Sequence, residues 1–198
     1  MTEYERMEQG MIYDPCDEEI MAEQRIYQDR LWEFNQLRPT NFAAKEAYLK
    51  ETFAECGEGC YIELPLHANW GGHHVHLGSG VYANSNLTLV DDGHIYVGDR
   101  VMIGPNVTIA TANHPMEPEL RAKGLQYNRD VRIGENTWIG AGVIIVPGVT
   151  VGKNVVIGAG AVVTKDIPDN VLAVGSPARI KREIIEDSDN DEFGGNDV

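Results

Sequence analysis

Hydrophobic residues in the second half of the chain recur every six positions. From Ile133 to Val163 the first residue of each six is Ile or Val, and Gly often follows it. The same phase appears upstream at Val97, Ile103 and Ile109. A helix repeats about every 3.6 residues and a strand about every 2, so neither fits. We therefore predict an all-β solenoid whose coils have three flat sides. Each side is a short strand, each corner is a tight turn, and the first-position side chains stack inside.

The six-residue pattern is interrupted in two places. Upstream it continues at Leu77, Ala83 and Leu89 only after a two-residue slip. Between residues 110 and 132 it is absent, yet the register resumes at Ile133. Because a long excursion from a rigid scaffold often carries function, we predict a protruding functional loop at 110–132.

The N-terminal part has helical spacing instead. Apolar residues between Asp17 and Asn35 predict an amphipathic helix, with Asp17 as N-cap and Arg38-Pro39 as its stop. A second helix is predicted from Asn41 to Cys56. We expect the two to cover one end of the prism, which otherwise exposes a sheet edge.

Three segments follow from these patterns. Residues 1–58 form a short N-terminal helical cap, residues 59–182 form the β-helix with its loop, and residues 183–198 form an acidic tail. The tail is rich in Asp, Glu, Gly and Asn, so we expect it to be disordered.

Composition narrows the possible partners. The 198 residues carry a formal net charge of −15; seven acidic and no basic residues lie from Glu183 onward, which leaves −8 for residues 1–182. Such a body repels a phosphate backbone, so we expect no nucleic-acid partner. No apolar run is long enough to cross a membrane, and the first residues do not resemble a secretory signal. The three cysteines form no disulfide framework, and we expect a cytoplasmic protein.

His114 is the first candidate for chemistry. It lies where the chain leaves the solenoid, and Pro115 after it favours an extended backbone. Imidazole can accept a proton from an alcohol near neutral pH, although a plain surface histidine fits the pattern equally well.

Two further groups of residues could bind small molecules. Tyr82, Asn84 and Asp92 combine a ring, an amide and a carboxylate, as sugar-binding surfaces do, although they could simply decorate one face. Basic residues gather late in the chain, where they could bind an anionic nucleotide beside small residues that admit a thin pantetheine arm. The basic residues are Lys153, Lys165, Arg179, Lys181 and Arg182, and the small ones are Ala141, Gly142, Gly158, Ala159 and Gly160.

Four clustered histidines raise the question of a metal. They are His67, His73, His74 and His76. Metal binding needs ligands that converge on one point, and on a period-six coil His67 lies away from the others. We predict no metal site.

Several stretches together resemble the maltose/galactoside O-acetyltransferases of the hexapeptide-repeat superfamily. The resemblance extends from about Tyr13 to Glu183, and its most specific parts are the segment from Tyr82 to Asp92 and the pair His114-Pro115. The other shared stretches are Tyr13-Asp14-Pro15, Glu33-Phe34-Asn35, Ile103 to Ile109, Trp138-Ile139-Gly140, Val162 to Pro168 and Val174 to Arg179.

The resemblance implies a left-handed parallel β-helix and a homotrimer with active sites between subunits. It also implies direct transfer of acetyl from acetyl-CoA to a hydroxyl of a sugar-like acceptor such as maltose, glucose or a galactoside, with His114 as general base. By the same resemblance the acceptor is bound by Asp14, Tyr82, Asn84 and Asp92, with Trp138 beside the reacting centre. Acetyl-CoA is expected along Ala141, Ala159, Thr164, Lys165, Arg179 and Arg182.

Departures from the family leave the acceptor open. Gln126 stands where a methionine is common, and His73-His74 replaces a stretch that is usually aromatic and amide. The rival hypotheses are an antibiotic O-acetyltransferase of the same superfamily and a non-catalytic β-helix scaffold. A γ-type carbonic anhydrase is disfavoured because no histidine follows His114.

Overall fold

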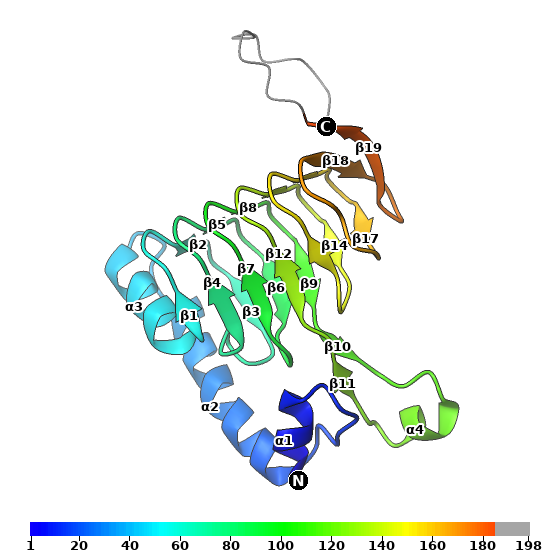
Figure 1. Ribbon diagram of the computed structural model, residues 1–198. Helices are drawn as coiled ribbons and strands as arrows, with labels where there is room; N and C mark the ends of the chain where they lie inside the picture. Colours follow the sequence, from blue (N-terminus) through cyan, green and yellow to red (C-terminus); the bar gives the residue numbers. More distant parts are fainter. Residues whose placement is uncertain (185–198) are drawn as a thin grey trace, which may run out of the picture.

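The body of the molecule is a left-handed parallel β-helix of about six turns with helices at its N-terminal end (Figure 1). The computed structural model describes residues 1–184, so the predicted acidic tail lies outside the described residues from position 185 onward. This architecture confirms the predicted fold class. The division at residues 58/59 stays a prediction.

Three sheets form the walls of the prism. Wall 1 contains β1 (Glu55–Cys56), β4 (Val75–Leu77), β7 (Ile95–Val97), β12 (Val131–Ile133) and β15 (Thr150–Val151). Wall 2 contains β2 (Tyr61–Ile62), β5 (Tyr82–Ala83), β8 (Met102–Ile103), β13 (Trp138–Ile139), β16 (Val156–Ile157), β18 (Val171–Val174) and β19 (Arg179–Glu183). Wall 3 contains β3 (Leu66–Ala68), β6 (Leu87–Val90), β9 (Thr108–Ala110), β14 (Ile144–Ile145) and β17 (Val162–Val163).

The core is the column of side chains that the six-residue pattern predicts. Parallel pairing places Ile133 between Val97 and Val151, and all three side chains are at most 5% exposed. Ile139 is likewise aligned with Ile103. Each such aliphatic side chain contributes about 1.5–3 kcal/mol when fully buried, which explains the strictness of the first position.

Asparagine ladders support the corners. Asn136, Asn154 and Asn170 have φ of 56°, 53° and 57°, in the left-handed region that asparagine tolerates. The Asn136 amide donates to Asn154 at 2.8 Å, and Asn154 donates to Asn170 at 2.9 Å. The turns of successive coils therefore stack in register.

The helices differ in part from the expectation. α2 (Glu18–Asn35) begins after Asp17, whose carboxylate accepts the Glu19 N–H at 3.0 Å, as predicted. α3 (Phe42–Thr52) is shorter than predicted, because Glu55–Cys56 already form the first strand of wall 1. α1 (Glu3–Glu8), with a capping box from Thr2, was not predicted.

The helices close the N-terminal end of the prism. Phe34, Leu49 and Phe53 are buried and continue the solenoid core. The Asn35 amide bonds to both backbone groups of Leu66, at 2.8 and 2.9 Å, so the edge of wall 3 is satisfied there. No helix among residues 1–184 is long and apolar enough to cross a membrane.

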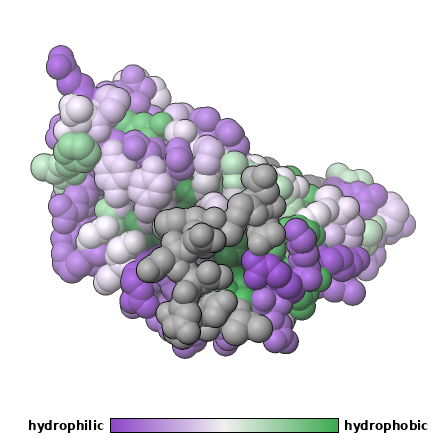
Figure 2. Space-filling model, turned by 90° about the horizontal axis from the view of Figure 1, so that it is seen from above, coloured by the Kyte–Doolittle hydropathy of each residue, from purple (hydrophilic) through white to green (hydrophobic). Residues whose placement is uncertain are grey.

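The predicted loop is a structured arm. β10 (Ala112–Asn113) pairs antiparallel with β11 (Tyr127–Asn128), and α4 (Pro118–Ala122) lies near its tip. In Figure 2 the molecule is seen from the β19 end, with the loop protruding at the right and mostly hydrophilic residues on this face. At that end β19 pairs antiparallel with β18. The sequence pattern did not predict β19.

Candidate active site

His114 stands on the stem of the loop. It follows β10 directly, and its side chain is exposed. Its Nδ1 lies 2.8 Å from the carbonyl oxygen of Leu125 on the returning strand. Because a carbonyl oxygen only accepts, Nδ1 donates this bond, and the neutral ring keeps its lone pair on Nε2.

A buried polar network anchors this stem to the body. The backbone of Tyr13 exchanges two hydrogen bonds with Gln126, at 2.8 and 3.0 Å. The Gln126 side-chain amide donates to the Tyr13 hydroxyl at 2.8 Å, and Asn128 donates to the carbonyl of Asp92 at 2.7 Å. Burial raises the pKa of Tyr13, so its hydroxyl stays protonated. The loop base, the N-terminal segment and the Asp92 corner therefore form one unit.

Two adjacent carboxyl groups at this corner have different environments. Asp91 is fully buried and accepts the N–H groups of Trp70 and Gly72, at 2.9 and 2.8 Å. Burial, together with the neighbouring Asp92 carboxylate, raises the pKa of Asp91 to about 7. Asp92 accepts the Asn69 amide at 2.7 Å. Asp91 is thus committed to the fold, whereas Asp92, at 7% exposure, keeps a small part of its surface in solvent.

The corner between walls 2 and 3, here called edge 2–3, contains the other predicted site residues. Asn84 lies in the turn after β5, Ala141 after β13 and Ala159 after β16. The corners stack closely: the Gly160 N–H donates to the Ala141 carbonyl at 2.8 Å. A Cβ on Gly140 would approach the Ala159 nitrogen to 2.7 Å, so only glycine fits there. The result is a narrow line of small residues.

Wall 2 exposes apolar side chains next to this edge. Strand register aligns Tyr82, Met102 and Trp138 in one outward row, with exposed fractions of 39%, 49% and 42%. The Tyr61 ring stacks parallel to Tyr82 at the start of the row, with an interplanar angle of 8°. Such a contiguous row is typical of a surface that another molecule covers.

The predicted residues therefore divide between two edges of one prism. His114 and Asp92 belong to the corner between walls 3 and 1, here called edge 3–1, and Asp14 follows Tyr13 at the loop base. Asn84 and the small residues lie on edge 2–3. β6 separates the edges, and its four residues span about 13 Å at about 3.3 Å each.

The late residues predicted for acetyl-CoA are also spread. Thr164 and Lys165 follow β17 at edge 3–1, and both are exposed. Arg179 begins β19 directly after Ala178, whose N–H donates to Val162 of wall 3 at 2.8 Å. Arg182 lies further along β19. Lys165, Arg179 and Arg182 therefore all belong to the last coil and to β19.

The histidine cluster and Gln126 have contacts within the fold. His74 is buried and donates from Nδ1 to the Asp91 carbonyl at 2.7 Å, and His73 stacks on Tyr27 with ring centroids 4.0 Å apart. In residues 1–184 no three His, Cys, Asp or Glu side chains are placed to hold a metal ion. Gln126 is only 8% exposed, so its polar end faces Tyr13 and not solvent.

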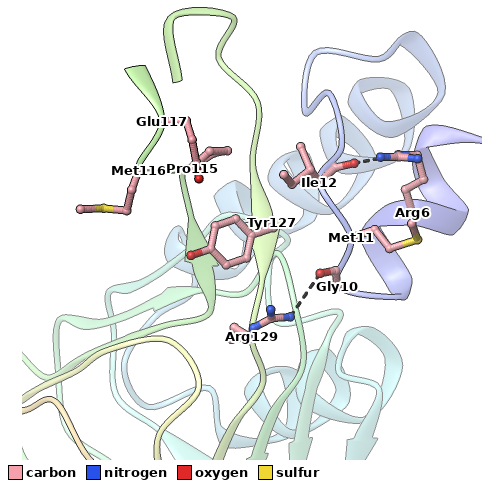
Figure 3. A pocket seen from close by; sticks show the side chains of 9 residues that line it. All are labelled: Arg6, Gly10, Met11, Ile12, Pro115, Met116, Glu117, Tyr127 and Arg129. Carbon is pink, nitrogen blue, oxygen red and sulfur yellow. Dashed lines mark hydrogen bonds between the residues drawn. The ribbon is translucent and has the colours of Figure 1, made fainter. Parts of the chain in front are cut away.

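An open pocket of about 520 Å³ lies between the loop stem and the N-terminal segment (Figure 3). Arg6 donates to the Ile12 carbonyl at 2.7 Å and Arg129 to the Gly10 carbonyl at 3.3 Å, so both guanidinium groups bind backbone. Pro115 lines the pocket, but His114 and the predicted acceptor residues do not.

Three side chains of the site region were missed by sequence reasoning. Asn69 and Asn128 hold Asp92, and the Thr111 hydroxyl accepts the Gly93 N–H at 2.8 Å. Their only sequence signal is position: Asn69 and Thr111 lie where a coil turns from wall 3, and Asn128 lies in β11 of the loop stem.

Comparisons with known proteins identify the family. Residues 6–57 match the maltose acetyltransferase hexapeptide capping motif, and residues 130–165 match the bacterial transferase hexapeptide family of six repeats. A galactoside O-acetyltransferase of Lactococcus lactis is 53% identical over 96% of this chain and 91% of its own length.

Solved structures have the same fold over nearly the whole chain. A galactoside acetyltransferase in complex with coenzyme A superposes with a TM-score of 0.92 and 41% identity, covering 100% of this chain and 98% of its own. A maltose O-acetyltransferase from Clostridium difficile 630 has a TM-score of 0.91 and 41% identity, covering 94% and 99%. The chain therefore belongs to the maltose/galactoside O-acetyltransferase family of hexapeptide-repeat proteins and is an acetyl-CoA-dependent O-acetyltransferase.

Proposed function

We propose that the protein transfers acetyl directly from acetyl-CoA to a hydroxyl of a sugar-like acceptor, with His114 as general base. The relatives named for galactoside and maltose acetylation support a sugar acceptor. The observation that carries the proposal is the Nδ1–Leu125 hydrogen bond, because it holds the ring in the tautomer whose Nε2 can accept a proton.

The reaction balances without a covalent enzyme intermediate. Nε2 of His114 takes the proton of the acceptor hydroxyl as its oxygen bonds to the thioester carbonyl carbon. The tetrahedral intermediate then breaks its C–S bond. The thiolate of CoA leaves with the proton from the imidazolium, and Nε2 is free again. The Leu125 carbonyl accepts from Nδ1–H throughout, and it stabilises the imidazolium while it exists.

The other site residues act by binding. Asp92 has its carboxylate at the same edge as His114, where with Asp14 it would accept hydroxyl hydrogens of the acceptor. Tyr82 and Trp138 offer rings on wall 2, and Asn84 offers an amide at edge 2–3. The line from Ala141 to Ala159 suits the pantetheine arm, and Thr164, Lys165, Arg179 and Arg182 suit the nucleotide phosphates.

We further propose that the active enzyme is a homotrimer. His114 and Asn84 lie on different edges with β6 between them, so edge 3–1 of one subunit would face edge 2–3 of its neighbour. The exposed row of Tyr82, Met102 and Trp138 gives that contact an apolar surface. In a closed ring with cyclic symmetry, every subunit makes the same contacts with its two neighbours.

Replacement of His114 by alanine tests the proposal. We expect kcat to fall by about 100-fold or more, because the general base is lost. The KM for acetyl-CoA should change little, because the residues of the acetyl-CoA groove are unaltered. Lys123→Ala is the matched control, since Lys123 is exposed at the end of α4 in the same loop. Near-normal turnover by folded His114→Ala would refute His114 as the base.

A further inference from the structure

A second pocket lies on wall 3, over β3 and over β6, the strand that leads to Asp92. Its volume is about 330 Å³, enough for one sugar ring. α2 forms one side with Gln28 and Trp32, and β3 and β6 form the floor with His67 and Thr88. Strand register places His67 opposite Thr88, so both side chains point outward from wall 3.

The lining has the chemistry of a saccharide site. Trp32 is 66% exposed, although an indole ring is expensive to leave in water. The other lining groups are polar: the Thr88 hydroxyl, the His67 ring and the amides of Gln28 and Asn69. An aromatic face covers the apolar C–H surface of a sugar ring, and the polar groups at its edge bind the hydroxyls.

The pocket adjoins the corner of Asp92, a buried residue that does not itself line the pocket. Asn69 lines it and donates its side-chain amide to the Asp92 carboxylate at 2.7 Å. The backbone of Asn69 is held as well, since its carbonyl accepts from Gln28 at 3.4 Å. A ligand that contacts Asp92 with one ring therefore has a neighbouring place for a second.

Resting on the proposed function, we infer that this pocket is a second acceptor subsite. It binds the sugar ring next to the one that is acetylated and selects disaccharides over monosaccharides, with Trp32 as the stacking platform. The Asn35–Leu66 pairing joins α2 to β3, so it fixes where the helix that carries Trp32 lies on wall 3.

The test compares maltose with methyl glucoside in the full-length enzyme. For Trp32→Ala we expect kcat/KM for maltose to fall by about threefold to tenfold through KM, while kcat/KM for methyl glucoside stays within about twofold. Trp32→Tyr should restore most of the loss. Ile26→Ala is the matched control, because Ile26 is an exposed apolar residue of the same helix outside the pocket.

The results distinguish failure of the subsite from failure of the proposed function. An equal loss for both sugars, an unchanged ratio, or a change in oligomeric mass caused by Trp32→Ala would overturn the subsite and leave the proposed function standing. Failure of the wild-type enzyme to acetylate maltose, methyl glucoside and a galactoside would overturn the proposed function and the subsite with it.

Discussion

Removing one hydroxyl from the loop anchor is expected to destabilise the protein measurably. In Tyr13→Phe the side-chain amide of Gln126 loses its acceptor at 2.8 Å. The remaining contact, to Asn128 at 3.5 Å, is too long to replace it. A buried amide without a partner costs about 1–3 kcal/mol. At about 2–4 °C per kcal/mol for a chain of this length, Tm should fall by about 2–12 °C.

A double-mutant cycle isolates the hydrogen bond. Gln126→Met removes the donor and keeps the length of the side chain. When both partners are replaced by apolar groups, the Gln126 amide is no longer left without an acceptor. Tyr13→Phe combined with Gln126→Met should therefore cost less than the two single changes added. Coupling of about 0.5–3 kcal/mol is expected for such a pair. Tyr127→Phe removes a hydroxyl from the same stem and serves as the control.

The assay is thermal unfolding at one protein concentration, followed by steady-state kinetics. Tyr13→Phe should also lower kcat, because the anchor positions the strand whose Leu125 carbonyl holds His114, while the KM for acetyl-CoA should not change. An unchanged Tm, or strictly additive costs in the cycle, would refute the anchoring role.

Three further predictions concern the cofactor groove, the assembly and the N-terminal helix. Arg179→Ala should raise the KM for acetyl-CoA by about tenfold or more, with the acceptor KM little changed, since a charge-assisted bond to a phosphate is worth about 1.5–3 kcal/mol; an unchanged value would show that this cation binds no phosphate. When the inactive His114→Ala and Asn84→Ala proteins are mixed and exchange subunits, some activity should return. No recovery would contradict a site shared between subunits. A hydrogen bond to Glu8 raises the pKa of His94 above its ordinary 6.5, so this contact stabilises most below that pH and is lost as pH rises through the folded value. The difference in Tm between wild type and His94→Gln should therefore shrink from about pH 6 to about pH 9, and a difference independent of pH would contradict the ion pair.

The solenoid could be predicted because its order is local. Burial of a first-position aliphatic such as Ile133 depends only on its place in the six-residue period. The slip upstream of Val97 marks the corner of Asp91 and Asp92. There Asp91 accepts the Trp70 N–H, and Asp92 accepts the Asn69 amide. α2 was predictable because eighteen residues carry its apolar spacing and a capping Asp17.

The missed features depend on contacts between distant segments. The pairing of β10 with β11 is stabilised by Tyr13, over a hundred residues away, and no local period encodes it. α1 has only six residues, too few for a periodic signal. Likewise, the hexads place Asn84 and Asp92 on corners, but only the coil count and register show that these are different edges.

The central claim is acetyl transfer from acetyl-CoA to a sugar hydroxyl under the control of His114. The most direct measurement incubates the purified full-length protein with acetyl-CoA and a panel of sugars, then quantifies released CoA thiol and acetylated sugar together. The account predicts equal amounts of thiol and O-acetyl sugar from wild type and the loss of both in His114→Ala. Thiol release without acetylated sugar, or equal product from His114→Ala, would contradict it.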